Sequence, residues 1–289
     1  MDEKITFAVI GGSGLYSMAG FDNVKEVAVD TPFGKPSAPI ILGSIEGKRI
    51  AFLARHGIGH HISPSEVNYR ANIFALKYLG ANRIVSISAC GSLRDDYAPG
   101  QIVIPDQIFD FTHKRARTFF ENGIVAHVGV AEPFCGSWSA RVYESVLGTG
   151  AIVHQGGSLI TIEGPRFSTK AESNIYRSWG LSIIGMTASP EAFLAREAEI
   201  CYATMAHVTD YDVWHENVEP VTVEMVIQTL NKNTATAQNA IRALAMNGGD
   251  RTECPCSTAL STAVITHPNA MPPEIRIKYE LLIGKYLQK

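Results

Sequence analysis

Short apolar runs alternate along the chain with segments whose apolar residues recur every three or four positions. Runs rich in β-branched residues and bounded by glycine or polar residues predict strands. The strands we expect cover 5–10, 39–42, 49–54, 83–89, 101–104, 158–162, 182–185 and 202–208. The first of these runs ends directly at a cluster of glycines.

The segments with helical spacing carry recognisable end signals. Three shorter helices are predicted by a Ser65 cap with Gly80 past the end, by the capping-box spacing of Thr169 and Glu172, and by Ser189 before Pro190. Longer helices are expected over about 222–248 and 273–287, the last amphipathic and able to cover its own core or to join subunits. Strands that alternate with helices from end to end predict a single α/β domain over 1–289.

Composition and charge narrow the class of protein. The chain has 289 residues, of which 46% are hydrophobic and 18% charged, as expected for a packed interior. A net charge of -3 offers no positive excess for a nucleic acid polymer, so an anionic substrate requires a local basic cluster. The start lacks the pattern of a secretory signal, and no apolar run reaches transmembrane length. We therefore expect a cytoplasmic protein without a membrane partner.

The glycine turn after the first strand is a candidate anion site. Gly11, Gly12 and Gly14 surround Ser13, and such turns offer free N–H groups to phosphates. Ser17 stands where the third glycine of a dinucleotide fingerprint belongs, which weakens the alternative of a nicotinamide oxidoreductase. A plain tight turn is equally consistent with this segment alone.

A second candidate follows the strand at 49–54. Arg55 and His56 can form a positive pocket for a dianion, with the guanidinium as a planar donor. The rival is a metal site made by His56, His60 and His61. Glycines at 57 and 59 make a helix improbable there, so anion binding is favoured over metal.

The third candidate is the acidic pair that closes the strand at 202–208. On an extended segment, residues two apart point the same way, so Asp210 and Asp212 can face one pocket. Mutual repulsion tends to raise one pKa and keep that carboxyl protonated as a general acid. A solvated turn is the alternative.

Motifs spread over roughly the first 230 residues resemble, in the same order, those of the 5'-methylthioadenosine phosphorylases, which belong with the trimeric purine nucleoside phosphorylases. They are Gly11–Leu15, Asp30–Pro36, Arg55–Gly57, Pro64–Tyr69, Ala89–Leu93, Ala131–Phe134, Thr161–Phe167, Gly185–Thr187, Pro190–Glu191 and Thr209–Asp212. The resemblance implies an α/β fold with a mixed, partly barrel-like sheet flanked by helices. It also implies a homotrimer or hexamer, an active site near a subunit boundary, and no metal or organic cofactor.

The reaction implied is phosphorolysis of 5'-methylthioadenosine to adenine and 5-methylthioribose 1-phosphate, with a broader purine nucleoside phosphorylase as the alternative. The resemblance assigns phosphate to Ser13, Arg55, His56, Ser88, Ala89 and Thr187, ribose to Met186, the base to Phe167, Ser168, Asp210 and Asp212, and the methylthio group to Val223, Val226, Ile227 and a neighbouring subunit's His127. Asp210 would be the catalytic acid. Gly185 stands where animal members carry Asn, so a side-chain contact is missing there.

The five cysteines form the last unusual feature. Cys90 lies in a family-like turn and is expected to be a buried thiol. Cys254 and Cys256, separated by Pro255 alone, could close a tight disulfide, chelate a metal or stay reduced. Our hypothesis is a pair of disulfides, Cys135–Cys201 and Cys254–Cys256.

Overall fold

The computed structural model describes residues 4–15, 17–215, 222–247 and 254–287, within which strands of one mixed sheet alternate with helices. The main path of the sheet runs β2-β3-β4-β1-β5-β10-β9-β7, and β11, β6 and β8 branch from β5. Over the described residues the sheet is open rather than closed into a barrel. The strands are β1 (Phe7–Gly11), β2 (Asp22–Val27), β3 (Ile40–Ile45), β4 (Lys48–Ala54), β5 (Arg83–Ser92), β6 (Ile102–Ile104), β7 (Gln107–Phe111), β8 (Val153–Gln155), β9 (Ser158–Ile162), β10 (Ile183–Gly185) and β11 (Cys201–Asp210).

Strand β5 organises this sheet. It runs parallel to β1 through its first half and parallel to β11 along nearly its whole length. At its far end it pairs antiparallel with β10, and β4 lies parallel to β1. The carboxyl ends of β1, β4, β5 and β11 therefore meet at one edge, where open α/β sheets place their ligand sites.

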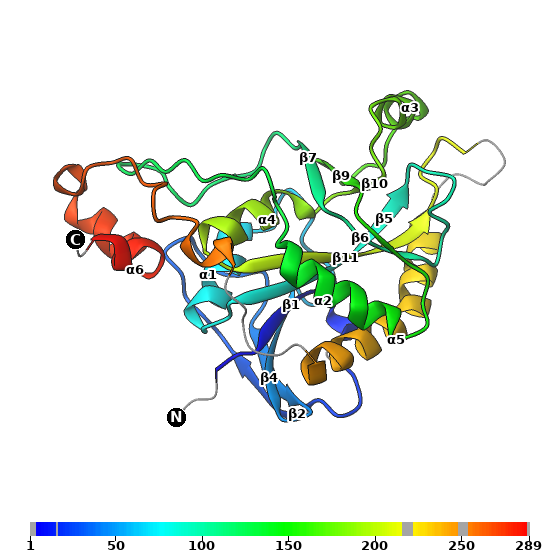
Figure 1. Cartoon of the computed structure of the whole chain (residues 1–289), viewed down its shortest axis with the longest axis horizontal. Helices are drawn as coiled ribbons and strands as arrows, with labels where there is room; N and C mark the ends of the chain where they lie inside the picture. Colours follow the sequence, from blue (N-terminus) through cyan, green and yellow to red (C-terminus); the bar gives the residue numbers. More distant parts are fainter. Residues whose placement is uncertain (1–3, 16, 216–221, 248–253, 288–289) are drawn as a thin grey trace.

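Helices cover both faces of the sheet (Figure 1). On one face α1 (Tyr69–Tyr78), α4 (Ala188–Glu197) and α6 (Pro273–Leu287) share a core with Ala8 and Ile10 of β1. On the other, α2 (Gly136–Leu147) and α5 (Val223–Asn247) share a core with Phe7 and Val9 of the same strand. This alternation along a fully buried strand explains its continuous apolar run. The remaining helix, α3 (Lys170–Ser178), follows β9, and short 3-10 turns are η1 (Ser13–Leu15), η2 (Pro255–Thr258) and η3 (Pro268–Ala270).

The predicted α/β class, the flanked mixed sheet and all eight predicted strands are confirmed, within a few residues at the ends. Strands β2, β7 and β8 and helix α2 were not predicted. Every residue of β2 is exposed or half-buried, so burial imposes no apolar pattern on it. The same holds for β7, which is partly exposed, and for β8, which has only three residues, none of them buried.

The predicted cap of the first helix is wrong. Helix α1 begins at Tyr69, and Asn68 caps it by accepting from the backbone N–H of Ala71 at 3.1 Å. Ser65 instead donates to the side chain of Glu163. The Ser65 hydroxyl is therefore used in a tertiary hydrogen bond to Glu163 and does not cap the helix.

The capping box is confirmed, because Thr169 and Glu172 form it at the start of α3. The predicted Ser189 cap is wrong. Helix α4 begins at Ala188 with Thr187 as its N-cap, and Ser189 lies inside it as a non-helical residue (φ −102°, ψ 134°) whose hydroxyl makes no hydrogen bond within the described residues. The long helix α5 and the last helix α6 lie where they were expected.

Helix α6 covers the protein's own core. Ile275, Tyr279 and Leu282 on its predicted apolar face are all buried, and the Tyr279 hydroxyl donates to the Phe119 carbonyl at 2.7 Å. Within the described ranges, no helix is both long and apolar enough to cross a membrane.

The disulfide hypothesis is wrong. All five cysteines are free thiols. Four of them instead form one cluster of sulfur atoms: Cys135, Cys201, Cys254 and Cys256. Within it the Cys201 sulfur lies 3.2 Å from the Cys254 sulfur, whereas the hypothesis paired Cys201 with Cys135. Convergence of three distant segments, rather than two isolated pairs, explains the error.

Candidate active site

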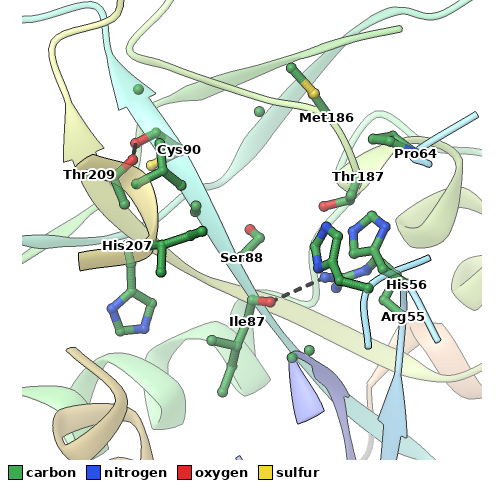
Figure 2. Close-up of a pocket in the computed structure, with 18 of the residues that line it drawn as sticks. Arg55, His56, Pro64, Ile87, Ser88, Cys90, Met186, Thr187, His207 and Thr209 are labelled. Atoms are coloured by element: carbon green, nitrogen blue, oxygen red, sulfur yellow. Dashed lines mark hydrogen bonds between the residues drawn. The ribbon is translucent and has the colours of Figure 1, made fainter. Parts of the chain in front are cut away.

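A cavity of about 680 Å³ opens at the sheet edge where the parallel strands end. It brings together nearly every site residue predicted above: Arg55, His56, Ser88, Ala89, Phe167, Ser168, Met186, Thr187, Asp210, Asp212, Val223, Val226 and Ile227. Figure 2 shows Arg55, His56 and Thr187 grouped on one side of Ser88, with Cys90 and Thr209 on its other side. The cavity therefore has two chemically different ends.

The glycine turn after β1 forms part of the wall. A Cβ at Gly11 would lie 2.5 Å from Leu15 Cδ1, so the Leu15 side chain would have to move to admit a larger residue here. Gly12 and Gly14 meet no atom within 4 Å at the same test, which leaves their backbone open toward the cavity. Gln238 of α5 fixes the turn by donating to the Gly14 carbonyl at 3.2 Å. The side chain of Ser13 lies outside the described residues.

Arg55 directly follows β4 and is almost completely buried. Its Nε and Nη2 donate to the two carboxylate oxygens of Glu191 at 2.7 and 2.9 Å, while Nη1 donates to the Ile87 carbonyl at 3.2 Å. Burial lowers the pKa of the Arg55 guanidinium, but the charge of Glu191 and its hydrogen bonds to Arg55 outweigh burial and hold that pKa above its usual value. The guanidinium therefore stays charged. The buried ion pair orients Arg55, and its net charge is close to zero.

His56 is neutral at physiological pH. Its Nδ1 lies 2.9 Å from the Ile62 carbonyl, which can only accept, so Nδ1 carries the proton. Burial, and then the charge of Arg55, lower its pKa to about 4. The His60 ring stacks on it at 4.4 Å. Within the described residues, His56, His60 and His61 do not form a group of metal ligands, and the rival metal site has no support.

Arg115 fixes another part of the cavity wall. Its buried guanidinium donates to the carbonyls of Met186 and Ser189, both at 2.7 Å, and to the carboxylate of Glu163 at 3.1 Å. These contacts fix the segment between β10 and α4 that carries Met186 and Thr187 into the cavity.

Asp210, the last residue of β11, is 6% exposed. Its Oδ2 accepts from the Thr209 hydroxyl at 2.6 Å and its Oδ1 from the backbone N–H of Asp212 at 2.7 Å. Burial outweighs these bonds and raises its pKa to about 6. This carboxyl can therefore carry a proton close to neutral pH.

Asp212 reaches the same cavity by a route that differs from the predicted one. The strand ends at Asp210, its register shifts between Val208 and Asp210, and Asp212 sits in a turn with φ 51°. Strand alternation is therefore not what brings the two carboxyls together. The bond from the Asp212 N–H to the Asp210 side chain does so instead, as in an Asx turn.

Three buried polar groups in and around the acidic pair have no hydrogen bond in the described part of the chain. They are Asp212 Oδ2 and the hydroxyls of Ser168 and Ser173. Burial also raises the pKa of Asp212. Since unpaired buried polar atoms are costly, they mark a place where a polar ligand would be bound.

Gly91 leaves room for Asp210. A Cβ at this position would lie 2.9 Å from Asp210 Oδ1 and 3.0 Å from Ile184 Cγ2. At Gly185, by contrast, the nearest atom to an added Cβ is the Ala89 carbonyl oxygen at 3.7 Å, an ordinary contact. The fold therefore does not require glycine at position 185, and a small side chain could be accommodated there.

Helix α5 contributes an apolar part of the cavity lining. Val223, Val226 and Ile227 line the cavity from the first turns of α5. His127 does not line the cavity of its own chain; it is exposed, and its backbone N–H donates to the Ala263 carbonyl at 2.9 Å. A role for His127 thus requires a neighbouring subunit.

Sequence reasoning missed several residues of this site. Glu191 and Arg115 bind other site residues across long sequence separations that no local pattern reveals. His207 also lines the cavity; neither ring nitrogen has a hydrogen-bond partner among the described residues, and burial lowers its pKa to about 4. Its place inside an otherwise apolar strand was the available signal.

Comparison with known proteins agrees with this geometry. A model of the phosphorylase superfamily matches residues 6–245. The S-methyl-5'-thioadenosine phosphorylase of Koribacter versatilis is 52% identical over 96% of this chain and 95% of its own. The relative of the same name from Hyperthermus butylicus is 49% identical over 91% of this chain and 96% of its own.

Solved structures give the same result. A methylthioadenosine phosphorylase from an antarctic soil metagenomic library superimposes with a TM-score of 0.92 at 45% identity, covering 96% of this chain and 99% of the other. The methylthioadenosine phosphorylase of Schistosoma mansoni in complex with adenine gives 0.81 at 39% identity, covering 86% and 93%. By fold and family model, the chain belongs to the phosphorylase superfamily. Within it, these relatives confirm the resemblance to the 5'-methylthioadenosine phosphorylases.

Proposed function

We propose that this protein is a pentosyltransferase that cleaves 5'-methylthioadenosine with phosphate, giving adenine and 5-methylthioribose 1-phosphate. The observation that carries the proposal is one cavity with an anion-binding end, a buried acidic pair and an apolar end. The names of the relatives support it. Membership of the superfamily favours it over the nicotinamide oxidoreductase.

Phosphate would bind at the end of the cavity formed by the glycine turn, Arg55, His56, Ser88 and Thr187. Because Glu191 already neutralises the charge of Arg55, that ion pair does not balance the negative charge of a bound phosphate dianion. Nη1 of Arg55 has one acceptor among the described residues, the Ile87 carbonyl, which leaves its second N–H for the ligand. Neutral His56 can take up a proton at Nε2 and donate it to a phosphate oxygen. Held across the ribose, phosphate acts as nucleophile and stabilises the developing positive charge of the sugar.

Asp210 is the proposed general acid. Breaking the bond between the ribose and N9 leaves negative charge on adenine, which a proton shared with N7 would stabilise. A pKa raised to about 6 makes a proton available at physiological pH without making the group a weak donor. Met186 would pack under the ribose, and Phe167 beside the purine.

The 6-position of the base is read by Asp212 and Ser168. The unpartnered Oδ2 of Asp212 can accept from the exocyclic amine of adenine. A 6-oxo purine would place an oxygen against the same carboxylate, and such a mismatch in a buried site is costly. We therefore expect 6-amino purines to be preferred over 6-oxo purines.

The apolar end formed by Val223, Val226 and Ile227 suits a thioether better than a 5'-hydroxyl. This distinguishes methylthioadenosine from adenosine, although a hydroxyl would cost only the loss of apolar contact. The alternative, a broader purine nucleoside phosphorylase, requires the enzyme to accept inosine as well.

The proposal includes one domain, in which the cavity described above draws on residues from Gly11 to Ala237. It also includes a homotrimer or hexamer that brings His127 to a neighbouring cavity. An aromatic cluster supports such a contact: Phe109, Phe111 and Trp179 are exposed, and the Trp179 ring lies 5.5 Å from that of Phe109 and 6.5 Å from that of Phe111. The free thiols suit the reducing cytoplasm.

A substrate comparison tests the function. Phosphate-dependent cleavage of methylthioadenosine, adenosine and inosine should fall in that order of kcat/KM. Asp212→Asn should lower cleavage of methylthioadenosine and raise the relative rate with inosine, because an amide can donate to an oxo group. Val226→Ala is the matched control, since it changes the other end of the cavity and should leave the amino-over-oxo preference unchanged. Preference of the unmodified enzyme for inosine would overturn the proposal.

A further inference from the structure

Four cysteines from three distant segments meet away from the cavity. Cys135 immediately precedes α2, Cys201 begins β11, and Cys254 and Cys256 flank the start of η2. Their sulfur atoms all lie within 4.8 Å of one another, and all four thiols are free. Three are buried and Cys254 is half-buried. Among the described residues, no other group of at least three such side chains comes together in this way.

The arrangement has the dimensions of a tetrahedral site. Zinc–sulfur bonds of about 2.3 Å place the sulfurs of a tetrathiolate about 3.8 Å apart. The limit of 4.8 Å for all pairs, and the 3.2 Å between Cys201 and Cys254, bracket that spacing. Thiolate ligands in tetrahedral geometry select zinc over the hard cations that prefer oxygen.

The surroundings suit a negatively charged centre. Arg196 places Nη1 3.4 Å from the Cys256 sulfur and is anchored through its Nη2 on the Glu132 carbonyl. The Ser137 hydroxyl lies 3.4 Å from the Cys135 sulfur, and Cys135 occupies the N-cap of the twelve-residue helix α2. A zinc ion with four thiolates carries two negative charges, which a guanidinium, a hydroxyl and a helix N-terminus all stabilise.

We propose that Cys135, Cys201, Cys254 and Cys256 bind one structural zinc ion. None of the four lines the cavity, and Cys201 lies at the end of β11 opposite to Asp210. The ion would fasten η2 to the start of α2 and to the central part of the sheet. It takes no part in the reaction, so the proposal stands whether or not the proposed function does.

Metal content is the direct test. The full-length protein is purified under reducing conditions, without chelators, from cells supplied with zinc. Elemental analysis should find one zinc ion per chain in the unmodified protein and in Cys90→Ser, which alters the one cysteine outside the cluster. Cys256→Ser should lose that ion. Circular dichroism establishes that each variant is folded.

A second measurement is independent of the variants. Zinc is removed from the unmodified protein with a strong chelator and a reductant, and cobalt(II) is added. A tetrathiolate site gives the charge-transfer and intense d–d absorption of tetrahedral cobalt–sulfur coordination, saturating at one equivalent. Removing the metal should also lower Tm in the unmodified protein and leave Tm of Cys256→Ser unchanged.

Three results would overturn the proposal. One is protein that lacks zinc and contains two disulfides after reducing purification. Another is protein with five reactive thiols that takes up neither zinc nor cobalt. The last is zinc bound equally well by Cys256→Ser.

Discussion

Replacing Asp210 with asparagine should make the protein more stable and less active at the same time. The substitution keeps the size of the side chain and removes its charge. The amide oxygen can still accept from the Asp212 N–H, and the Thr209 hydroxyl can accept from the amide while it donates to the Cys90 carbonyl, 3.2 Å away. The local hydrogen bonds therefore survive, and the loss of the ionisable carboxyl is the main change.

The size and sign of the effect follow from the pKa of Asp210, raised from 3.8 to about 6 by burial. Below 3.8 the carboxyl is protonated in both the folded and the unfolded chain and has no effect on stability. As pH rises toward 6, the unfolded chain ionises first, and the folded state loses about 1.4 kcal/mol per pH unit. Above pH 6 the accumulated loss is about 3 kcal/mol. Asp210→Asn removes this loss.

The difference in unfolding free energy between Asp210→Asn and the unmodified protein is measured by urea unfolding at pH 7.5 and pH 4, at one fixed protein concentration. The variant should unfold at higher urea than the unmodified protein at pH 7.5, with an unchanged slope m, and the difference should shrink toward zero at pH 4. Phosphorolysis should fall by about 10²–10⁴-fold, the usual contribution of a general acid. Asp22→Asn, at an exposed carboxyl of β2, is the control and should change neither quantity.

Two results would exclude this role of Asp210. If Asp210→Asn destabilises the protein at pH 7.5, or if its effect does not change with pH, the buried carboxylate is not disfavoured in the fold. If the variant cleaves substrate at a near-normal rate, Asp210 is not the acid.

Three further predictions concern the neighbouring groups. Gly91→Ala should lower kcat/KM and cost about 1–3 kcal/mol of stability, because the added Cβ would lie 2.9 Å from Asp210 Oδ1. Gly185→Ala is the control and should be tolerated. Equal effects of the two substitutions would show that the space beside Asp210 is not what Gly91 provides. Because His56 has a pKa of about 4 and must gain a proton to donate to an anion, sulfate affinity measured by calorimetry should rise as pH falls from 7 toward 4. His56→Gln should flatten that dependence, and an unchanged slope would exclude the histidine. Glu191→Ala should cost about 3–5 kcal/mol in urea unfolding, because the buried guanidinium loses its carboxylate partner; a change near zero would show that the ion pair does not stabilise the fold.

Much of the fold could be predicted because burial leaves a periodic trace in the sequence. Strands β1 and β11 are buried along their whole length and read as continuous apolar runs. The exposed strand β2 leaves no such trace. Helix α2 was within reach, since Trp138, Val142 and Val146 recur at four-residue spacing and are all buried. Polar residues between them obscured that pattern.

The site could be predicted as a set of residues but not as a geometry. Asp210 and Asp212 were correctly placed in one pocket, yet the reason was a turn rather than strand alternation. Arg55 was expected to supply free positive charge, whereas Glu191 neutralises it from a helix far along the chain. Contacts over such separations depend on the packed fold, which no local pattern encodes. The pairing of the cysteines failed for the same reason.

In the proposed reaction phosphate, rather than water, attacks the ribose at C1'. The most direct measurement incubates the protein with methylthioadenosine in ¹⁸O-labelled water, with and without phosphate, and analyses both products by mass spectrometry. We expect that adenine and 5-methylthioribose 1-phosphate form in equal amounts, that the sugar contains no label, and that omitting phosphate stops the reaction. Adenine release that continues without phosphate, with label at C1' of free methylthioribose, would contradict the proposed reaction.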